Sequence, residues 1–179
     1  MGKYHNKIGI LGGSFDPAHN GHLAISKIAI KKIRLSKIYW VVTKKNPFKK
    51  KHFFNLNKRF LLAKKIALKE KKIKVTYLDG ITKSSRSINT IKYLFKKNKP
   101  NDLYFIIGSD ILLELHRWRS WKRIVKLTKL IVFSRRGYDT KSKESIVSKY
   151  LNKKNIIFIK NKPINISSSY LRKNFKINN

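Results

Sequence analysis

Short apolar segments alternate along the chain with segments in which apolar residues recur every three or four positions. The apolar segments are rich in Ile, Val, Phe and Tyr, and several are apolar on both faces, which is typical of buried strands in a parallel sheet. They predict strands over residues 7–12, 37–43, 73–78, 102–108, 129–134 and 155–160. The periodic segments predict helices over residues 22–33, 56–70, 87–97, 143–151 and 167–175.

This alternation predicts an α/β fold, in which a Rossmann-like open parallel sheet is flanked by helices and joined by right-handed crossovers. The chain shows no internal repeat and no linker, so residues 1–179 are expected to form one domain. The stretch 44–55 is basic and irregular, and we expect it to form a loop over the site.

The charge of the chain is strongly positive, with 44 Lys and Arg residues against 8 Asp and Glu and a formal net charge of +36. Such a charge fits a polyanionic partner, namely nucleic acid or a membrane surface. Codon usage is the alternative, because Lys, Asn and Ile have A/T-rich codons and are all abundant. We favour codon usage, since the lysines are spread along the whole chain and phosphate recognition relies more on arginine. No specific nucleic acid and no membrane is therefore expected as a partner, and the oligomeric state is left open.

Cysteine is absent, which excludes disulfides and thiolate zinc sites and fits a reducing compartment. No apolar run approaches the roughly 20 residues of a membrane span. The N-terminal segment lacks the longer apolar core of a signal peptide. These observations predict a cytoplasmic protein.

The sequence GGSFDPAHNGH, residues 12–22, follows the first predicted strand. Ligands of open α/β sheets bind beyond the carboxyl ends of the strands, where Gly12 and Gly13 would let a ligand approach the main chain. Two imidazoles near a helix start, His19 and His22, suit hydrogen bonds to phosphate oxygens. A helix-capping role is an equal alternative for either histidine.

Several other chemistries are disfavoured at this loop. The P-loop pattern, the GxGxxG pattern and the nucleophile elbow of serine hydrolases are absent. His19 and His22 are not at the i, i+4 spacing of helical metal ligands, and no third ligand lies nearby in sequence. We therefore assign no metal-ligating residue.

The whole stretch resembles the first motif of the nucleotidyltransferase superfamily marked by H/T-x-G-H, and more narrowly the GGSFDPxHxGH of bacterial nicotinate-nucleotide adenylyltransferases. ISSSYLR, residues 166–172, resembles the second superfamily motif, I-S-S-T-x-I/L-R, with Ser169 in place of threonine. The two motifs lie in the same order as in the family, near opposite ends of the chain.

Shorter segments between these motifs are also similar to the family. They are NPFK (46–49), SRSINT (85–90) and FIIGSD (105–110), and Trp118 lies 19 residues before Gly137, which is the family's interval. The chain departs from the family pattern at Ser87, Asn89 and Arg136, where threonine, an acidic residue and proline are usual. The resemblance covers nearly the full chain.

The resemblance implies that the chain is an adenylyltransferase of NAD biosynthesis, whose partners are ATP and nicotinate mononucleotide. The products would be nicotinate adenine dinucleotide and pyrophosphate. A phosphate oxygen of the mononucleotide would attack the α-phosphorus of ATP in line, and this nucleophile is ionised at neutral pH, so no general base is needed. Mg²⁺ would bridge the phosphates, held mainly by ATP and water.

The resemblance also implies a role for each matched residue. His22 would hold the α-phosphate as negative charge develops, with His19 beside it, and these two are the expected catalytic residues. The expected ATP-binding residues are Gly12, Gly13, Ser14, Phe15, His19, His22, Lys49, Gly108, Asp110, Ile166, Ser167, Ser168, Ser169 and Arg172. The expected mononucleotide-binding residues are Ser87, Trp118 and Arg135.

Structural alternatives stay open for several of these residues. Ser167 or Ser168 suits a helix N-cap, as does Asp110. Trp118 suits a core position on an amphipathic helix, Lys49 suits a solvated charge, and Asp16 with Pro17 suits a turn rather than a catalytic acid.

Three other functions remain as alternatives. Nicotinamide mononucleotide differs from the proposed substrate by one carboxylate. Phosphopantetheine adenylyltransferases share the superfamily motifs but usually have threonine at the position of His19. A basic nucleic-acid-binding protein is the alternative that is not an enzyme.

Overall fold

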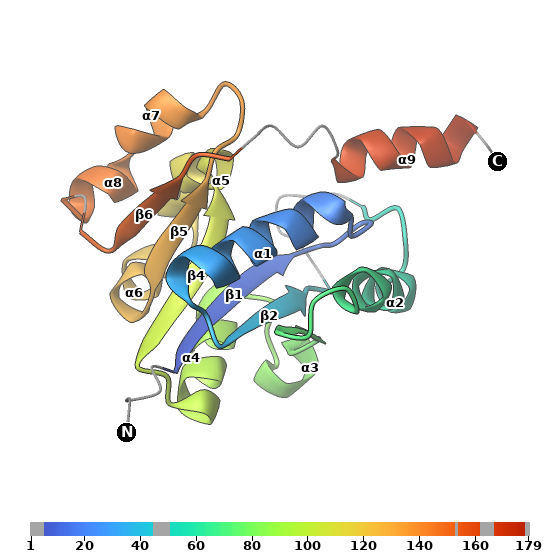
Figure 1. The fold of residues 1–179 in the computed structure, drawn as a ribbon, viewed down its shortest axis with the longest axis horizontal. Coiled ribbons are helices and arrows are strands. Elements are labelled where there is room, and N and C mark those ends of the chain that lie inside the picture. The colour runs from blue at the N-terminus through green and yellow to red at the C-terminus, as the bar shows by residue number, and fades with distance from the viewer. Residues whose placement is uncertain (1–5, 45–50, 153, 162–166, 178–179) are drawn as a thin grey trace.

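The computed structural model describes residues 6–44, 51–152, 154–161 and 167–177, and a six-stranded sheet lies at its centre (Figure 1). All neighbouring strands run parallel, in the order β3-β2-β1-β4-β5-β6. The strands are β1 (Lys7–Gly13), β2 (Lys37–Val42), β3 (Ile73–Thr76), β4 (Asp102–Gly108), β5 (Lys129–Phe133) and β6 (Ile156–Ile159). The expected open parallel sheet is confirmed, with a strand in each of the six predicted places.

The strand order reverses between β1 and β4. Strand β1 pairs with β2 on one side and with β4 on the other, so the chain first builds outward to β3 and then returns to build from β4 to β6. Ligands of such sheets bind beyond the carboxyl ends of the strands at this reversal. Gly12 and Gly13 end β1 and Gly108 ends β4, so these glycines lie at the expected place.

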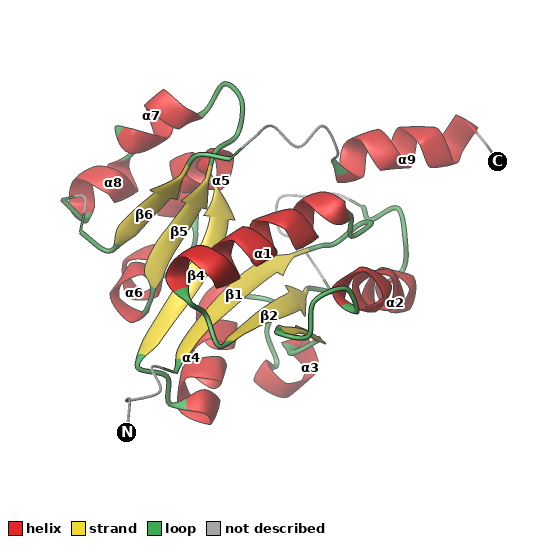
Figure 2. Ribbon diagram, viewed as in Figure 1, coloured by secondary structure: helices red, strands yellow, loops and turns green. Residues whose placement is uncertain are grey.

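Helices cover both faces of the sheet (Figure 2). Successive residues of a strand point to opposite faces, and in β2 this places Ile38, Trp40 and Val42 in one core and Tyr39 and Val41 in the other. The first core is closed by α1 (Asn20–Ile33) and α2 (Leu56–Ala67). The second is closed by α4 (Ser87–Asn98), α5 (Ser109–Glu114), the 3₁₀ helix η1 (Leu115–Arg117), α6 (Trp121–Leu127) and α8 (Ile146–Tyr150).

The remaining helices are α3 (Asp79–Thr82), α7 (Asp139–Lys143) and α9 (Ser168–Ile177). The helix that the sequence predicts over 143–151 is present as α8, but it begins only at Ile146, and the preceding α7 is not predicted. Ser145 adopts an extended backbone between them, and its hydroxyl accepts a hydrogen bond from the Ser148 N–H, which caps α8.

No helix among the described residues has both the length and the apolar composition that crossing a bilayer requires.

Candidate active site

The loop after β1 leaves its main chain accessible. Phe15 has a left-handed backbone with φ of 47°, and its buried ring stacks on Trp40 at 5.2 Å between centroids. Gly12 is exposed, and a Cβ built on it would meet no atom closer than the Phe105 ring at 4.0 Å. The bare backbone at Gly12 therefore faces open space, as close approach of a ligand requires.

His19 and His22 cap the start of α1 reciprocally. The His19 Nδ1 atom accepts a hydrogen bond from the Gly21 N–H at 3.1 Å. The His22 Nδ1 atom accepts one from the His19 N–H at 3.2 Å. Because a main-chain N–H can only donate, both Nδ1 atoms carry a lone pair, and in the neutral rings the proton is on Nε2. The capping alternative is therefore present in the structure, and it leaves one donor on each ring.

The two imidazoles are neutral at physiological pH. Burial, followed by the charge of Arg135, lowers the pKa of His19 to about 4. Burial, followed by the neighbouring His19 and by Arg135, lowers the pKa of His22 to about 3. The ring centroids lie 3.9 Å apart, so two protonated rings would repel each other strongly. The site thus offers two uncharged N–H donors beside a helix start.

Buried groups behind α1 fix the position of His22. The Ser26 hydroxyl donates to the His22 carbonyl at 2.8 Å and accepts from the Trp40 indole N–H at 2.9 Å. The Phe15 ring lies 4.9 Å from the His22 ring. Sequence reasoning did not identify Ser26 or Trp40, because their contacts depend on how α1 packs on β2.

The start of α9 contacts the loop after β1, although the two segments are far apart in sequence (Figure 1). The Ser168 hydroxyl donates to the Pro17 carbonyl at 2.9 Å. Arg172 donates from Nη1 to the Asp16 carbonyl at 2.7 Å and from Nη2 to the Ser169 hydroxyl at 2.8 Å. The two superfamily motifs therefore lie side by side in space.

Ser167 caps this helix start, since its hydroxyl accepts the Tyr170 N–H at 3.1 Å. This contact fits the structural alternative for the serines. Ile166 and Lys49, both expected ATP contacts, lie outside the described residues.

Gly108, Asp110 and Arg135 meet at the end of β4. A Cβ on Gly108 would collide with the Asp110 Oδ1 atom and lie 2.9 Å from the Arg135 Nε atom. Arg135 Nε is 3.3 Å from Asp110 Oδ1. The N-cap of α5 is Gly108, so the capping alternative for Asp110 is wrong, and its carboxylate lies in the first turn instead.

Asp139 holds the loop that carries Arg135. Its Oδ1 atom accepts from the Ser109 hydroxyl at 2.9 Å and from the Arg135 N–H at 3.0 Å, and its Oδ2 atom accepts from the Ser134 hydroxyl. The Ser134 bond in particular lowers the pKa of Asp139, so the carboxylate stays ionised. This network ties the loop after β5 to the end of β4, and sequence reasoning missed it.

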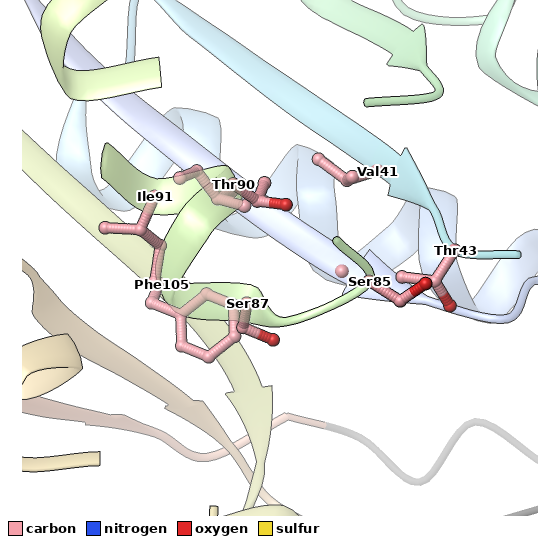
Figure 3. Close-up of a pocket in the computed structure, with 9 residues that line it drawn as sticks. Val41, Thr43, Ser85, Ser87, Thr90, Ile91 and Phe105 are labelled. Atoms are coloured by element: carbon pink, nitrogen blue, oxygen red, sulfur yellow. The ribbon is translucent and has the colours of Figure 1, made fainter. Parts of the chain in front are cut away.

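A narrow pocket lies between the ends of β1, β2 and β4 and the start of α4 (Figure 3). Its cavity volume is about 10 Å³, which is room for about one water molecule. Ser87, one of the expected mononucleotide contacts, is in its wall. The lining residues are Ile10, Gly12, Val41, Thr43, Ser85, Ser87, Thr90, Ile91 and Phe105.

Trp118 is not among the residues that line this pocket. The Trp118 ring is half-buried, packs against the second core, and meets the Phe105 ring edge to face at 6.3 Å. It does not lie on a helix as the structural alternative supposed, because it follows η1 with an extended backbone. The Trp118 ring therefore contacts one of the residues that line the pocket.

Among the described residues, no group of three or more His, Asp or Glu side chains is placed to hold a metal ion. Asp16, the acid nearest to the histidines in sequence, is buried and fully engaged, because its two oxygens accept the N–H groups of Phe53 and Phe54 at 2.9 Å each. The role of Asp16 is therefore larger than the turn that the sequence suggested.

Two further side chains of the site were not identified from sequence. The His52 Nε2 atom lies 3.2 Å from the Ser14 hydroxyl, which adds a third imidazole beside the loop. Arg59 is 1% exposed. A signal for Arg59 was present, since it occurs four residues before Ala63 and eight before Ala67, on the buried side of α2.

The sequence is similar to a known family of nucleotide-transferring enzymes. A family model described as cytidylyltransferase-like matches residues 10–174. A probable nicotinate-nucleotide adenylyltransferase from Pelagibacter ubique is 48% identical over 167 residues, covering 93% of this chain and 92% of the relative. One from Clostridium novyi with the same description is 36% identical over 176 residues, covering 95% and 87%.

A solved structure supports the fold. The nicotinic acid mononucleotide adenylyltransferase of Plasmodium falciparum, solved in complex with NaAD, superposes with a TM-score of 0.76 at 21% identity, covering 94% of this chain and 83% of that one. At 21% identity, this superposition supports the fold and nothing about function.

Proposed function

This chain belongs to the cytidylyltransferase-like family and, within it, to the nicotinate-nucleotide adenylyltransferases, and from that premise we propose how its residues perform the reaction. The chain joins ATP and nicotinate mononucleotide into nicotinate adenine dinucleotide, releasing pyrophosphate, in NAD biosynthesis. In the mechanism that we propose, a phosphate oxygen of the mononucleotide attacks the α-phosphorus in line. The bond from the α-phosphorus to the bridging oxygen of pyrophosphate breaks, and no proton transfer is needed.

The Nε2–H groups of His19 and His22 stabilise the charge that develops on the α-phosphate. The observation that carries this role is the reciprocal cap, which engages both Nδ1 atoms as acceptors and leaves Nε2 as the donor on each ring. A preorganised donor of this kind is worth roughly 10²–10³ in rate. The rings stay neutral, so they bind phosphate by hydrogen bonds rather than as ion pairs.

The start of α9 binds the β- and γ-phosphates of ATP. Ser168 and Ser169 lie in its first turn, where main-chain N–H groups attract anions, and Ser168 is anchored to the loop after β1. Arg172 fastens this helix start and adds positive charge. We assign Lys49 and Ile166 to the same triphosphate by their motifs.

The remaining ATP contacts are main-chain groups and one carboxylate. The exposed backbone at Gly12 supports close approach of the nucleotide, and we propose that it lies along residues 12–15. Gly108 and Asp110, at the end of β4, contact the adenosine part. Asp110 suits hydroxyl donors, because its buried Oδ1 atom is paired with the Arg135 charge at 3.3 Å but accepts no hydrogen bond within the described part of the chain.

The mononucleotide occupies the pocket that Ser87 lines, with its phosphate toward Arg135. Arg135 supports this placement, because its charge acts on both histidines and its side chain is exposed. The cavity is narrow, about 10 Å³, and we propose that binding widens it by a movement of Phe105, which contacts Trp118, so that the pyridine ring reaches the Trp118 ring.

Mg²⁺ would neutralise the phosphates of ATP. The described residues form no cluster of acidic ligands, and both oxygens of Asp16 are already engaged, so the donor set fits a cation held by ATP and water. We also propose a cytoplasmic location, which the absence of cysteine favours.

Pyrophosphate release tests the substrate assignment. The purified chain is given ATP, Mg²⁺ and one of nicotinate mononucleotide, nicotinamide mononucleotide or phosphopantetheine, and kcat/KM is compared. The proposal expects nicotinate mononucleotide to be the best of the three. Equal or faster turnover of either alternative would overturn the assignment.

A further inference from the structure

Arg59 is a fully buried cation whose hydrogen bonds to other described residues all go to main-chain carbonyls. Its Nη1 atom donates to the Ser14 carbonyl at 2.6 Å and to the Thr43 carbonyl at 2.8 Å. Its Nε atom donates to the Phe54 carbonyl at 3.1 Å, and Nη2 lies 3.4 Å from the Lys44 carbonyl. A carbonyl oxygen is part of the main chain, so these hydrogen bonds hold the backbone itself. The guanidinium therefore fixes the positions of three chain segments relative to one another: the one at Ser14, the one at residues 43–44 and the one at Phe54.

These segments belong to both substrate sites. Ser14 is in the loop after β1 and is one of the residues assigned to ATP. Thr43 lines the pocket assigned to the mononucleotide. A single nitrogen, Nη1, bridges the two carbonyls, so the separation between the two binding sites is restrained by two short hydrogen bonds.

The carboxylates of two buried aspartates accept hydrogen bonds from main-chain N–H groups of the same segments. Asp16 accepts the N–H groups of Phe53 and Phe54. Asp79, 7% exposed, accepts the Lys44 N–H at 2.8 Å and the Ser85 hydroxyl at 2.6 Å, both through Oδ2. Ser85 is another lining residue of the pocket.

The two carboxylates also compensate the buried charge of Arg59. Burial lowers the pKa of Arg59, and the charges of Asp16 and Asp79 oppose that effect. A buried cation without such compensation would be strongly destabilising. Within the described part of the chain, Arg59, Asp16 and Asp79 thus form one buried network that is joined through the backbone segments they share and through charge, not through a direct ion pair.

We propose that Arg59 is a positioning residue that sets the distance between the two substrate sites, and that Asp79 shapes the mononucleotide side alone. This inference depends on the proposed function for its assignment of the two sites. In-line attack requires the nucleophilic oxygen and the α-phosphorus to be aligned, and a displacement of about 1 Å can cost about 10² in rate. Arg59 hydrogen-bonds directly to the main chain of both sites, so its position affects the alignment of the two substrates.

Three variants separate the contributions. In Arg59→Lys the charge is kept but the planar fork that reaches all four carbonyls is lost. We expect kcat/KM to fall about 10- to 100-fold, with KM raised for both substrates. Asp79→Asn should raise KM about tenfold for the mononucleotide and leave KM for ATP unchanged. Lys65→Met, at an exposed position of α2, is the matched control and should leave all constants unchanged.

A role limited to folding makes a different prediction. In that case Arg59→Lys would lower the melting temperature, while kcat and both KM values per folded molecule, measured well below that temperature, would stay within twofold of the original chain. Either that result, or a change of KM for ATP alone, would overturn the inference. As a second test, millimolar guanidinium should partly restore the rate of Arg59→Ala, whereas ammonium at equal ionic strength should not.

The original chain distinguishes failure of the inference from failure of the proposed function. If the original chain turns over another acceptor instead of nicotinate mononucleotide, the substrate assignment is wrong, and the same three variants are compared with that acceptor. If the original chain works as proposed and Arg59→Lys is kinetically unchanged, only the positioning role fails.

Discussion

Each histidine of the loop after β1 divides two tasks between its two ring nitrogens. Nδ1 accepts a main-chain N–H and caps α1, while Nε2–H is the donor assigned to phosphate. Capping and catalysis are therefore not competing explanations for His19 and His22. The division can be tested because asparagine places a polar atom near the position of Nδ1 and glutamine places one near Nε2.

At His22, asparagine and glutamine should have opposite effects. His22→Asn keeps an acceptor for the His19 N–H and loses the phosphate donor, so kcat should fall about 10²–10³-fold with little loss of stability. His22→Gln keeps a donor near Nε2 and loses the cap, so it should retain more activity and lose about 0.5–2 kcal/mol of unfolding free energy. Steady-state kinetics and urea unfolding measure both quantities. Equal activity of the two variants would contradict the division of tasks.

The lowered histidine pKa values predict how stability depends on pH. A solvated imidazole titrates near pH 6.5, whereas His19 and His22 titrate near 4 and 3, so the unfolded chain binds more protons than the folded chain between these values. The free energy of unfolding should be highest above pH 6.5 and should fall as the pH falls toward 4. Urea unfolding at a series of pH values measures this slope, and His22→Asn should reduce it. An unchanged slope in that variant would contradict the assignment.

The residue identities of the site could be predicted from motifs, but many of its contacts could not. Asp16 is readable as a turn residue, yet its hydrogen bonds to Phe53 and Phe54 depend on a loop that arrives from another strand. The same holds for Asp139, whose partners come from the ends of β4 and β5. When a side chain binds main-chain groups of a distant segment, the residues around it in sequence do not reveal that contact.

At the scale of elements, the strands were predictable and the short helices were not. Buried parallel strands are continuous apolar runs, so β1, β2, β4 and β5 stand out from their surroundings, and the edge strands β3 and β6 are partly exposed but rich in β-branched residues. Helices α3, α5 and α6 span 4, 6 and 7 residues, too few for a 3.6-residue period to become visible. The same limit explains why α7, which spans 5 residues, is not predicted.

The position of α9 depends on a few contacts with the loop after β1. Arg172→Ala removes the bond to the Asp16 carbonyl, which should loosen the helix start and raise KM for ATP about tenfold with a smaller effect on the mononucleotide. Lys173→Ala, an exposed neighbour on the same helix, is the control and should behave like the original chain. Unchanged KM for ATP in Arg172→Ala would show that this anchor is not needed for phosphate binding.

At the scale of the whole molecule, the +36 charge should act on anionic substrates through a long-range field. Raising the ionic strength from about 0.05 M to about 0.5 M shortens the screening length and should lower kcat/KM several-fold for both substrates, with kcat less affected. A titration of steady-state rates with salt measures this effect. A kcat/KM value independent of salt would contradict any role for the charge in substrate capture.

The same charge keeps nucleic-acid binding as a rival interpretation. Non-specific binding to phosphate backbones weakens steeply with salt, and we expect binding of duplex DNA to disappear near physiological ionic strength. Sequence-specific binding that persists there would support the rival function.

The central claim is that the start of α1 and the start of α9 bind one triphosphate between them. A crystal structure with a non-hydrolysable ATP analogue tests it most directly. The account predicts the α-phosphate within hydrogen-bond distance of the His22 Nε2 atom, with the β- and γ-phosphates at the first turn of α9 beside Ser168 and Ser169. A triphosphate bound elsewhere, contacting neither helix start, would contradict the account.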